Sequence, residues 1–371
     1  MNEDSGLFNW NVFDDLPSDK FIYIRWIEKT CDSLIREIDD KRHVIHPISF
    51  FIGSNEPDNR IRIHNFVREN PSYYRKMLEK IIHTDIKGFI FTFDWYFVFR
   101  DIVEIANAKG ISTILIPHEG VFSSEEQYYK DRVYGYNFPI CNFCLLWGDL
   151  QRKIFIRRGH AGSGLMLVGA PKFEKIFKLQ LDKKVSKGDS YLLVLQNMDC
   201  QILQKEAVEF QNKLIQFMCL YTIAKNKRLI IRNPPNNINM IPNSIKKDYI
   251  DINECVNDFN NDNAIDAIMA SSVVISINST MLLEAKLCSK IAISVTNENI
   301  DNIWSDYDIE TLFSLSELEI RLNSIDKVHV EHSLTSELLK IDFGLNFESP
   351  RASIRKFLIG MLNDTHSNYD D

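Results

Sequence analysis

The sequence lacks a long apolar run, a regular pattern of cysteines and an excess of positive charge. Its longest apolar stretch, around residues 89–99, is interrupted by Thr92 and Asp94, and it is shorter than the run of about 18 residues expected of a membrane-spanning helix. Residues 1–15 are acidic and polar, without the charged and then apolar order of a signal peptide. The seven cysteines are scattered, unlike those of a disulfide-rich secreted domain. We therefore expect a cytoplasmic protein.

Acidic side chains outnumber basic ones by 51 to 43, which gives a formal net charge of −8. Because nucleic-acid binding relies on a basic surface that meets phosphates, this balance argues against a nucleic-acid partner. Of the 371 residues, 45% are hydrophobic and 25% are charged, a composition typical of soluble proteins that bury a core. A chain of this length corresponds to about two or three domains, and two is the better interpretation.

Short apolar stretches alternate with helix-length mixed stretches along most of the chain, and this pattern predicts parallel sheets covered by helices. In the first half we expect strands at 20–27, 45–52, 88–93, 111–117, 144–147 and 165–168. Residues 172–189 are charged and weakly periodic, and we interpret them as an interdomain linker. In the second half we expect strands at 191–195, 228–232, 272–277 and 290–295.

The two α/β halves predict two Rossmann-like domains that face each other across a cleft. The first domain would cover residues 1–175 and the second residues 188–345. Residues 346–371 would form a helix and tail that return to the first domain. Ligands of such folds bind beyond the carboxyl ends of the strands, so we expect the ligand in the cleft between the halves.

The sharpest polar cluster lies at the end of the third expected strand of the second half. Ser276, Asn278, Ser279 and Thr280 precede a helix there, and free N–H groups at a helix start can bind a phosphate. Glu284 lies one turn into that helix, where its carboxylate can accept two hydrogen bonds from a ribose diol. The alternative is an ordinary helix cap followed by a solvated glutamate.

Two further strand ends of the second half carry candidate residues. Arg232 ends a strand immediately before a rigid Asn-Pro-Pro turn, which would present its charge to the cleft. An ordinary surface arginine is the alternative. Gln196 begins a polar run that includes Asp199, a candidate nucleophile or charge stabiliser. Alternatively, Asp199 caps the helix that follows.

In the first half, His118 and Glu119 end a strand beside a glycine and could form an acid/base pair. A turn with two exposed polar side chains is the alternative. Asp94 lies at the equivalent point of the neighbouring strand. Cys141 and Cys144 have the spacing of metal ligands, but no second Cys or His pair follows. We interpret them as buried thiols and expect no metal.

The order of these motifs resembles that of two-domain glycosyltransferases of the GT-B type, and most closely the bacterial retaining β-Kdo transferases. Those enzymes use CMP-Kdo to add 3-deoxy-D-manno-oct-2-ulosonic acid (Kdo) to capsule linkers or O-antigen glycans. His118-Glu119-Gly120 resembles a Glu-Asp-Gly stretch of the family. The run from Gln196 to Asp199 resembles its Gln-x-x-x-Asp segment.

The remaining two segments of the resemblance lie further along the chain. Arg232-Asn233-Pro234-Pro235 stands where the family often has Lys-Pro-His-Pro, so an arginine replaces the lysine and the histidine is missing. The segment from Ser276 to Thr280, with Glu284-Ala285, resembles a Ser/Thr-rich strand end followed by Glu-Ala.

The resemblance implies a cytoplasmic glycosyltransferase with a GT-B fold, a nucleotide-sugar donor and no other cofactor or metal. Glu119, with His118 beside it, would be the acid/base group, and Asp199 would attack or stabilise the anomeric carbon in a retaining reaction. The donor and its nucleotide would be bound by Gln196, Arg232, Ser276, Asn278, Ser279, Thr280 and Glu284. The acceptor would be a glycan or glycolipid. Peripheral attachment to the inner membrane, or to a polysaccharide-assembly partner, stays open.

Two other kinds of protein remain as alternatives. One is another GT-B enzyme, either a nucleotide-sugar epimerase or a glycerophosphate-type polymerase. A polymerase usually carries a basic surface that binds the membrane, and a pI of about 5.7 weighs against it. The other is a catalytically silent subunit that binds a nucleotide sugar.

Overall fold

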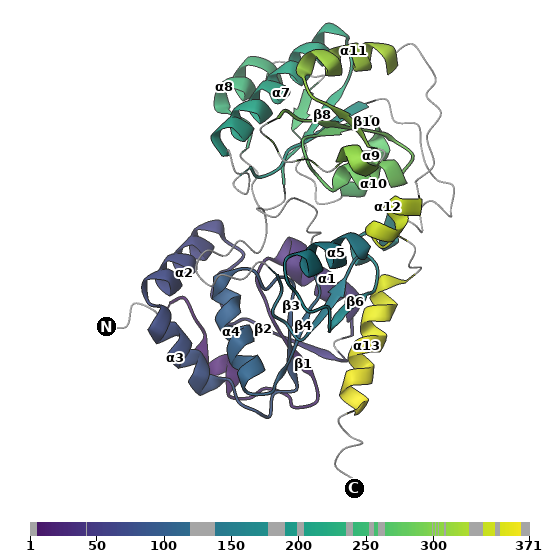
Figure 1. Cartoon of the computed structure of the whole chain (residues 1–371). Coiled ribbons are helices and arrows are strands. Elements are labelled where there is room, and N and C mark those ends of the chain that lie inside the picture. Colours follow the sequence, from purple (N-terminus) through teal and green to yellow (C-terminus); the bar gives the residue numbers. More distant parts are fainter. Residues whose placement is uncertain are drawn as a thin grey trace. The chain divides into compact units, whose positions relative to one another are not determined.

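The computed structural model describes residues 6–41, 43–118, 138–176, 190–198, 204–234, 240–251, 256–258, 264–298, 300, 302, 304–307, 309–325, 337–345 and 349–364. The chain divides into two compact units, each shown in Figure 1. Unit 1 takes its residues from Met1–Val121, Tyr128–Lys172 and Ile341–Asp371, and unit 2 takes them from Phe122–Gln127 and Phe173–Lys340.

Unit 1 is built on a parallel six-stranded sheet with the order β2-β1-β3-β4-β5-β6. Its strands are β1 (Phe21–Ile24), β2 (Ile45–Ile48), β3 (Gly88–Phe91), β4 (Ser112–Leu115), β5 (Phe143–Leu146) and β6 (Leu165–Leu167). The strands β1 and β3 are buried at every position, as expected of a parallel sheet covered on both faces. All six expected strands of the first half are confirmed.

Helices cover both faces of this sheet. One apolar cluster joins the sheet to α2 (Pro57–Glu69), α3 (Pro71–Ile81), α4 (Phe97–Ala108) and α5 (Asp149–Arg157). Another joins the opposite face to α1 (Ser33–Ile38) and α13 (Pro350–Asp364). Both clusters remove continuous apolar surface from water, which is the main driving force for folding of the unit.

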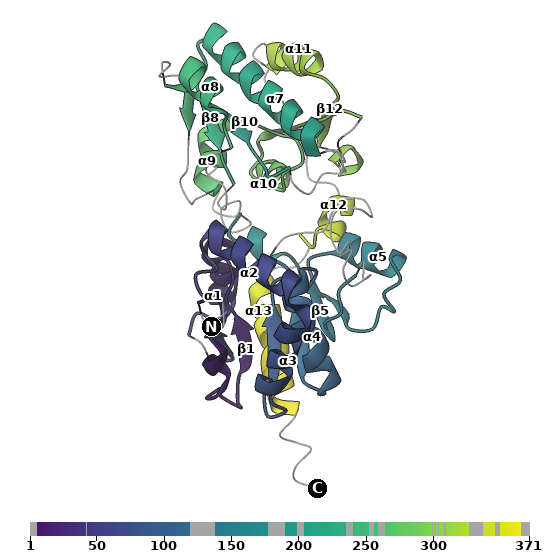
Figure 2. The ribbon, with the colours of Figure 1, turned by 90° about the vertical axis from the view of Figure 1, so that its left-hand side faces the viewer.

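The C-terminal segment belongs to unit 1, as Figures 1 and 2 show for α13 in yellow. Ile354 and Leu358 of α13 are fully buried in the cluster that contains α1. Arg351 pairs with Glu37 and donates a hydrogen bond of 3.2 Å to the carbonyl oxygen of Pro171. The helix is therefore held by apolar burial along its length and by polar contacts at its start.

Unit 2 contains a second parallel six-stranded sheet, with the order β12-β11-β10-β7-β8-β9. Its strands are β7 (Ser190–Val194), β8 (Leu229–Arg232), β9 (Val256–Asp258), β10 (Ser271–Ser276), β11 (Ile291–Val295) and β12 (Glu310–Leu312). One face packs on α7 (Gln204–Ala224) and α11 (Leu315–Ile325). Near the other lie α9 (Ala264–Ala270) and α10 (Met281–Leu287), and α8 (Asn243–Ile245) is a short turn.

The four expected strands of the second half are confirmed, and the edge strands β9 and β12 are additional. Both edge strands are only three residues long, so their apolar pattern is too short to stand out in the sequence. The fold class is confirmed: two parallel α/β sheets, each covered by helices. Within the described part of the chain, no helix has both the length and the apolarity needed to cross a bilayer.

Candidate functional site

The carboxyl edge of the unit 2 sheet holds a row of polar residues set by strand register. Val194 pairs with Arg232 on one side and with Ser276 on the other, and Ser276 pairs with Ser294. In parallel sheets, ligands bind beyond this edge. The row and the loops that follow it therefore form the candidate site of unit 2.

Gln196 connects the ends of β7 and β10. Its Oε1 accepts a hydrogen bond of 2.8 Å from the backbone N–H of Asn278 and lies 3.4 Å from the hydroxyl of Ser276. The backbone N–H of Gln196 donates to Oε1 of Gln211 on α7 at 3.1 Å. These contacts fix the position of Gln196 from two sides.

Ser276 differs from its expected role as a phosphate ligand. It is fully buried, and its hydroxyl donates a hydrogen bond of 2.8 Å to the carbonyl oxygen of Val194. The hydroxyl thus satisfies a strand-end carbonyl group within the sheet. Asn278, Ser279 and Thr280, by contrast, are half-buried.

Acceptors within the same segment occupy the N–H groups in the first turn of α10. The N–H of Met281 donates to the hydroxyl oxygen of Ser279, and the N–H groups of Leu283 and Glu284 donate to the carbonyl oxygen of Thr280. The sequence-based expectation of free N–H groups at this helix start is therefore wrong for these three positions.

Glu284 is 2% exposed, so the alternative of a solvated glutamate is wrong. Burial, and then the nearby Glu284 carboxylate, raise the pKa of Cys288 to about 11. A carboxylate buried to this degree needs hydrogen-bond donors around it to offset the loss of water. Glu284 is thus enclosed within unit 2, in the first turn of α10.

Arg232 is 6% exposed and Asn233, which follows it, is 4% exposed. The alternative of an ordinary surface arginine is therefore wrong. Arg232 lies at the last position of β8, and its carbonyl oxygen accepts the N–H of Leu195. Its guanidinium group is held inside the unit near the strand ends, where a buried cation can meet an anionic ligand.

Three further hydrogen bonds connect the loop after β10 to Ser294 and Asn302, and the sequence analysis missed them. Asn302 donates to the carbonyl oxygen of Ile277 at 2.9 Å and to the hydroxyl of Ser294 at 2.6 Å. Ser294 in turn donates to the carbonyl oxygen of Ile277 at 2.7 Å. Ser294, the next-to-last residue of β11, was the available signal, because a polar residue inside an apolar strand needs a partner.

In unit 1, His118 follows β4 and is half-buried. Its backbone N–H donates to the carbonyl oxygen of Thr92, and its Nδ1 lies 3.1 Å from the same oxygen. The ring also lies beside Phe93. His118 is therefore anchored at the carboxyl ends of β3 and β4. Glu119 and Asp199 lie outside the described residues.

Asp94 follows β3 and is fully buried. Its Oδ2 accepts the backbone N–H groups of Ile140 and Cys141, at 2.8 and 3.2 Å. Asp94 thus holds the segment that leads into β5. Burial, assisted by this carboxylate, raises the pKa of Cys141 and Cys144 well above the ordinary value. Among the described residues, no group of three or more His, Cys, Asp or Glu could hold a metal.

No protein-family model and no curated protein sequence matches the chain. Among solved structures, it is similar to Methanocaldococcus jannaschii UDP-GlcNAc 2-epimerase in complex with UDP-GlcNAc and UDP. That match has a TM-score of 0.59 and 13% identity, and it covers 92% of this chain and 100% of that one.

Two other structures are similar over most of their length. S. aureus MnaA, in a co-structure with UDP, has a TM-score of 0.57 and 8% identity, with 93% of this chain and 97% of that one covered. The wall teichoic acid polymerase TagF has a TM-score of 0.53 and 9% identity, with 95% and 91% covered. At such low identity these likenesses concern the fold alone. The chain has the GT-B type of fold.

Proposed function

We propose that this chain is an enzyme that acts on a nucleotide-activated sugar, and that its reaction is glycosyl transfer. The observation that carries the proposal is the carboxyl edge of the unit 2 sheet, with Gln196, Asn278 and the buried Glu284. Parallel α/β sheets bind nucleotides beyond this edge. Two similar structures contain UDP, which supports a nucleotide as the ligand of this fold.

In this proposal, each group at the edge has a role that suits its chemistry. The Glu284 carboxylate accepts hydrogen bonds from the ribose diol. Asn278, Ser279 and Thr280 bind the donor phosphate through their side chains, and Gln196 fixes the loop that carries them. Arg232 neutralises the phosphate, or a carboxylate of the donor sugar, and stabilises the leaving nucleotide without a metal.

The more specific part of the proposal is a retaining transfer of Kdo from CMP-Kdo to a glycan or glycolipid of the bacterial surface. It rests on the motif resemblance. Glu119, beside His118, would act as the acid/base group for the acceptor hydroxyl. Asp199 would attack or stabilise the anomeric carbon. If so, Glu119→Gln and Asp199→Asn abolish turnover while nucleotide affinity is kept. A silent binding subunit has no turnover to lose.

A nucleotide-sugar epimerase is the second candidate. The observation that favours it is the likeness to epimerase structures, one of which is bound to UDP-GlcNAc and UDP. The two candidates differ in their need for an acceptor. An epimerase converts UDP-GlcNAc without one, whereas a transferase releases nucleotide from its donor only when an acceptor is present. Product analysis of both incubations by mass spectrometry and NMR separates them.

The nucleotide site can be tested with an isosteric substitution. Glu284→Gln removes the charge and keeps the shape, and it is expected to weaken nucleotide binding by about 1–3 kcal/mol because charge-assisted hydrogen bonds are lost. Calorimetry with CMP and UDP measures this change. Glu319→Gln, at an exposed position of α11, is the matched control. Equal affinity of wild type and Glu284→Gln for every nucleotide that binds would remove Glu284 from the site.

A further inference from the structure

A small pocket lies in unit 1. It is formed where α1 covers β1 and β2, at the edge of the sheet, and its cavity volume is about 40 Å³. Four charged side chains line it, together with Tyr23, Ile35, Ile45 and Pro47; the charged ones are Arg25, Asp32, Arg36 and Asp39. A space of this size admits a few waters or one compact charged group.

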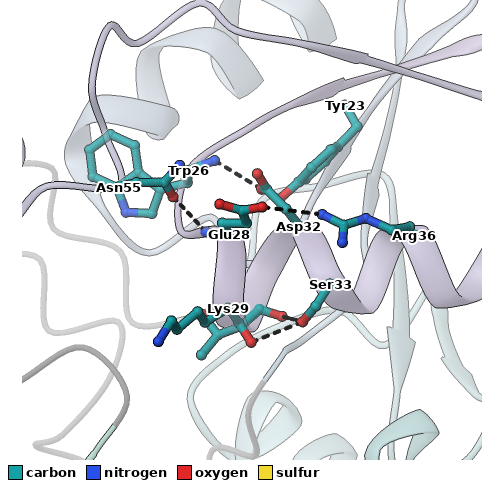
Figure 3. A network of polar contacts seen from close by, with 9 residues as sticks. Tyr23, Trp26, Glu28, Lys29, Asp32, Ser33, Arg36 and Asn55 are labelled. Carbon is teal, nitrogen blue, oxygen red and sulfur yellow. Dashed lines mark hydrogen bonds and ion pairs between the residues drawn. The ribbon is translucent and has the colours of Figure 1, made fainter. Parts of the chain in front are cut away.

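The Asp32 carboxylate accepts hydrogen bonds from neighbouring residues, as Figure 3 shows. Its Oδ1 accepts the hydroxyl of Tyr23 at 2.7 Å and the backbone N–H of Trp26 at 3.2 Å. Burial, and then the charges of Cys31 and Asp32, raise the pKa of Tyr23 well above its ordinary value. The Tyr23 hydroxyl therefore stays protonated and keeps donating to Asp32.

The Asp39 carboxylate is engaged as well. It is 2% exposed, its Oδ1 accepts the N–H of His43, and its Oδ2 accepts the N–H groups of Val44 and Ile45 at 2.9 and 2.8 Å. Asp39 thus closes the turn between α1 and β2. Both acidic side chains of the pocket are committed to the fold, so neither is set up to bind a cation.

The side chains of the two arginines make fewer hydrogen bonds and ion pairs than the two aspartates do. Arg36 is exposed and makes a long ion pair of 3.7 Å with the equally exposed Glu28, a contact that contributes little in water. Arg25 is half-buried, and its side chain has no hydrogen-bond or ion-pair partner among the residues that the structure describes. A half-buried guanidinium group favours a ligand that accepts two parallel hydrogen bonds.

We propose that this pocket binds a compact oxyanion, namely a phosphate or carboxylate group of a small molecule, between Arg25 and Arg36. The two arginines come from different parts of the chain, Arg25 from the position directly after β1 and Arg36 from α1. They are separate in sequence and share one pocket. A group of two or three oxygens uses their N–H donors while the apolar side chains exclude part of the water. All lining residues of the pocket belong to unit 1, and none of them is a residue of the proposed nucleotide site.

The test is calorimetric titration of the full chain with inorganic phosphate, and separately with acetate, at constant ionic strength. Saturable binding of at least one anion is expected. Arg25→Gln and Arg36→Gln should each weaken it about tenfold, because each removes a charge-assisted hydrogen bond. Binding of phosphate alone identifies a phosphate ligand, and binding of acetate alone a carboxylate ligand.

Arg68→Gln is the matched control, since Arg68 is an exposed arginine of the same unit and does not line the pocket. It should change the affinity less than twofold. Arg36 is itself exposed, so Arg36→Gln is expected to fold normally, and a melting curve checks each variant. The proposal is overturned if neither anion binds saturably, or if all three variants weaken binding equally. Glu284→Gln should leave anion binding unchanged, which keeps this test separate from that of the nucleotide site.

Discussion

The Oε1 of Gln196 accepts the backbone N–H of Asn278 at 2.8 Å, across 82 positions of sequence. This contact joins the loops that leave two neighbouring strands of unit 2, at the edge where we place the nucleotide. It also occupies a backbone N–H that would otherwise be available to a phosphate. In the proposed function, Gln196 is therefore a positioning residue that holds the loop after β10.

Replacing Gln196 should loosen this edge. Gln196→Ala leaves the N–H of Asn278 without its present acceptor and removes the contact with the Ser276 hydroxyl, while the backbone N–H at position 196 still donates to Gln211. We expect a loss of about 1–3 kcal/mol of unfolding free energy. Nucleotide affinity should fall as well. Urea unfolding and calorimetry measure both quantities. Gln216→Ala, which removes an exposed hydrogen bond to Tyr249, should do neither; equal losses in the two variants would contradict the assignment.

A second prediction concerns the effect of replacing Gly344 on the stability of unit 1. Its φ is +67°, and a Cβ there would overlap the carbonyl oxygen of Trp147. Gly344→Ala should therefore destabilise unit 1 by at least about 2 kcal/mol, from backbone strain and steric overlap together. A urea or thermal unfolding curve tests this.

Gly360 provides the opposite expectation within the same C-terminal segment. It lies in α13, and a Cβ there would meet nothing within 4 Å. Gly360→Ala should stabilise the protein by about 0.5–1 kcal/mol, because alanine loses less backbone entropy in a helix. If Gly344→Ala were as stable as Gly360→Ala, the close approach of the C-terminal segment to Trp147 would be incorrect.

The start of α13 can be tested through Arg351. Arg351→Ala removes the ion pair with Glu37 and the hydrogen bond to Pro171, and a loss of about 1–2 kcal/mol is expected because both contacts are partly buried. Hydrogen exchange should show faster opening of α13 amides. Lys356→Ala, an exposed position of the same helix, is the control and should exchange like wild type.

His160 predicts a pH dependence of stability. Burial lowers its pKa below the ordinary 6.5, against the opposing charge of Asp94, and its Nδ1 accepts the N–H of Gly162 at 2.9 Å. Because the unfolded chain protonates first, stability that is complete above about pH 6.5 is lost as the pH falls toward the lower folded pKa. His160→Gln should reduce the slope of unfolding free energy between about pH 7 and pH 5. His83→Gln, at an exposed position, should leave the slope unchanged.

Most of the fold could be predicted from the sequence because the parallel strands are continuous apolar runs. The stretch Val273 to Ile275 is buried at every position, and such runs are visible without any partner. The edge strands β9 (Val256–Asp258) and β12 (Glu310–Leu312) were missed, because three residues are too few to show the apolar pattern of a strand. Helix α11 (Leu315–Ile325) was also missed, although its buried face of Leu318 and Leu322 has helical spacing.

The site could be predicted only in part. Strand ends are visible in sequence, so Arg232 and Glu284 could be named as candidates, but their burial is a tertiary property that sequence does not reveal. The use of Ser276 inside the sheet depends on the carbonyl oxygen of Val194, a partner 82 positions away. Asn302 was missed for the same reason, since its bond to Ser294 exists only once the loop has folded back.

The central claim, a nucleotide site in unit 2, is tested most directly by thermal-shift titrations of the purified chain with CMP, UDP, CDP and GDP. A ligand that binds only the folded state adds about 2.7 kcal/mol at a hundredfold excess over its Kd. The account predicts a rise in melting temperature with at least one nucleotide, and a smaller rise for Glu284→Gln. A rise with CMP supports the Kdo donor, and a rise with UDP favours the epimerase candidate. No rise with any of the four would contradict the account.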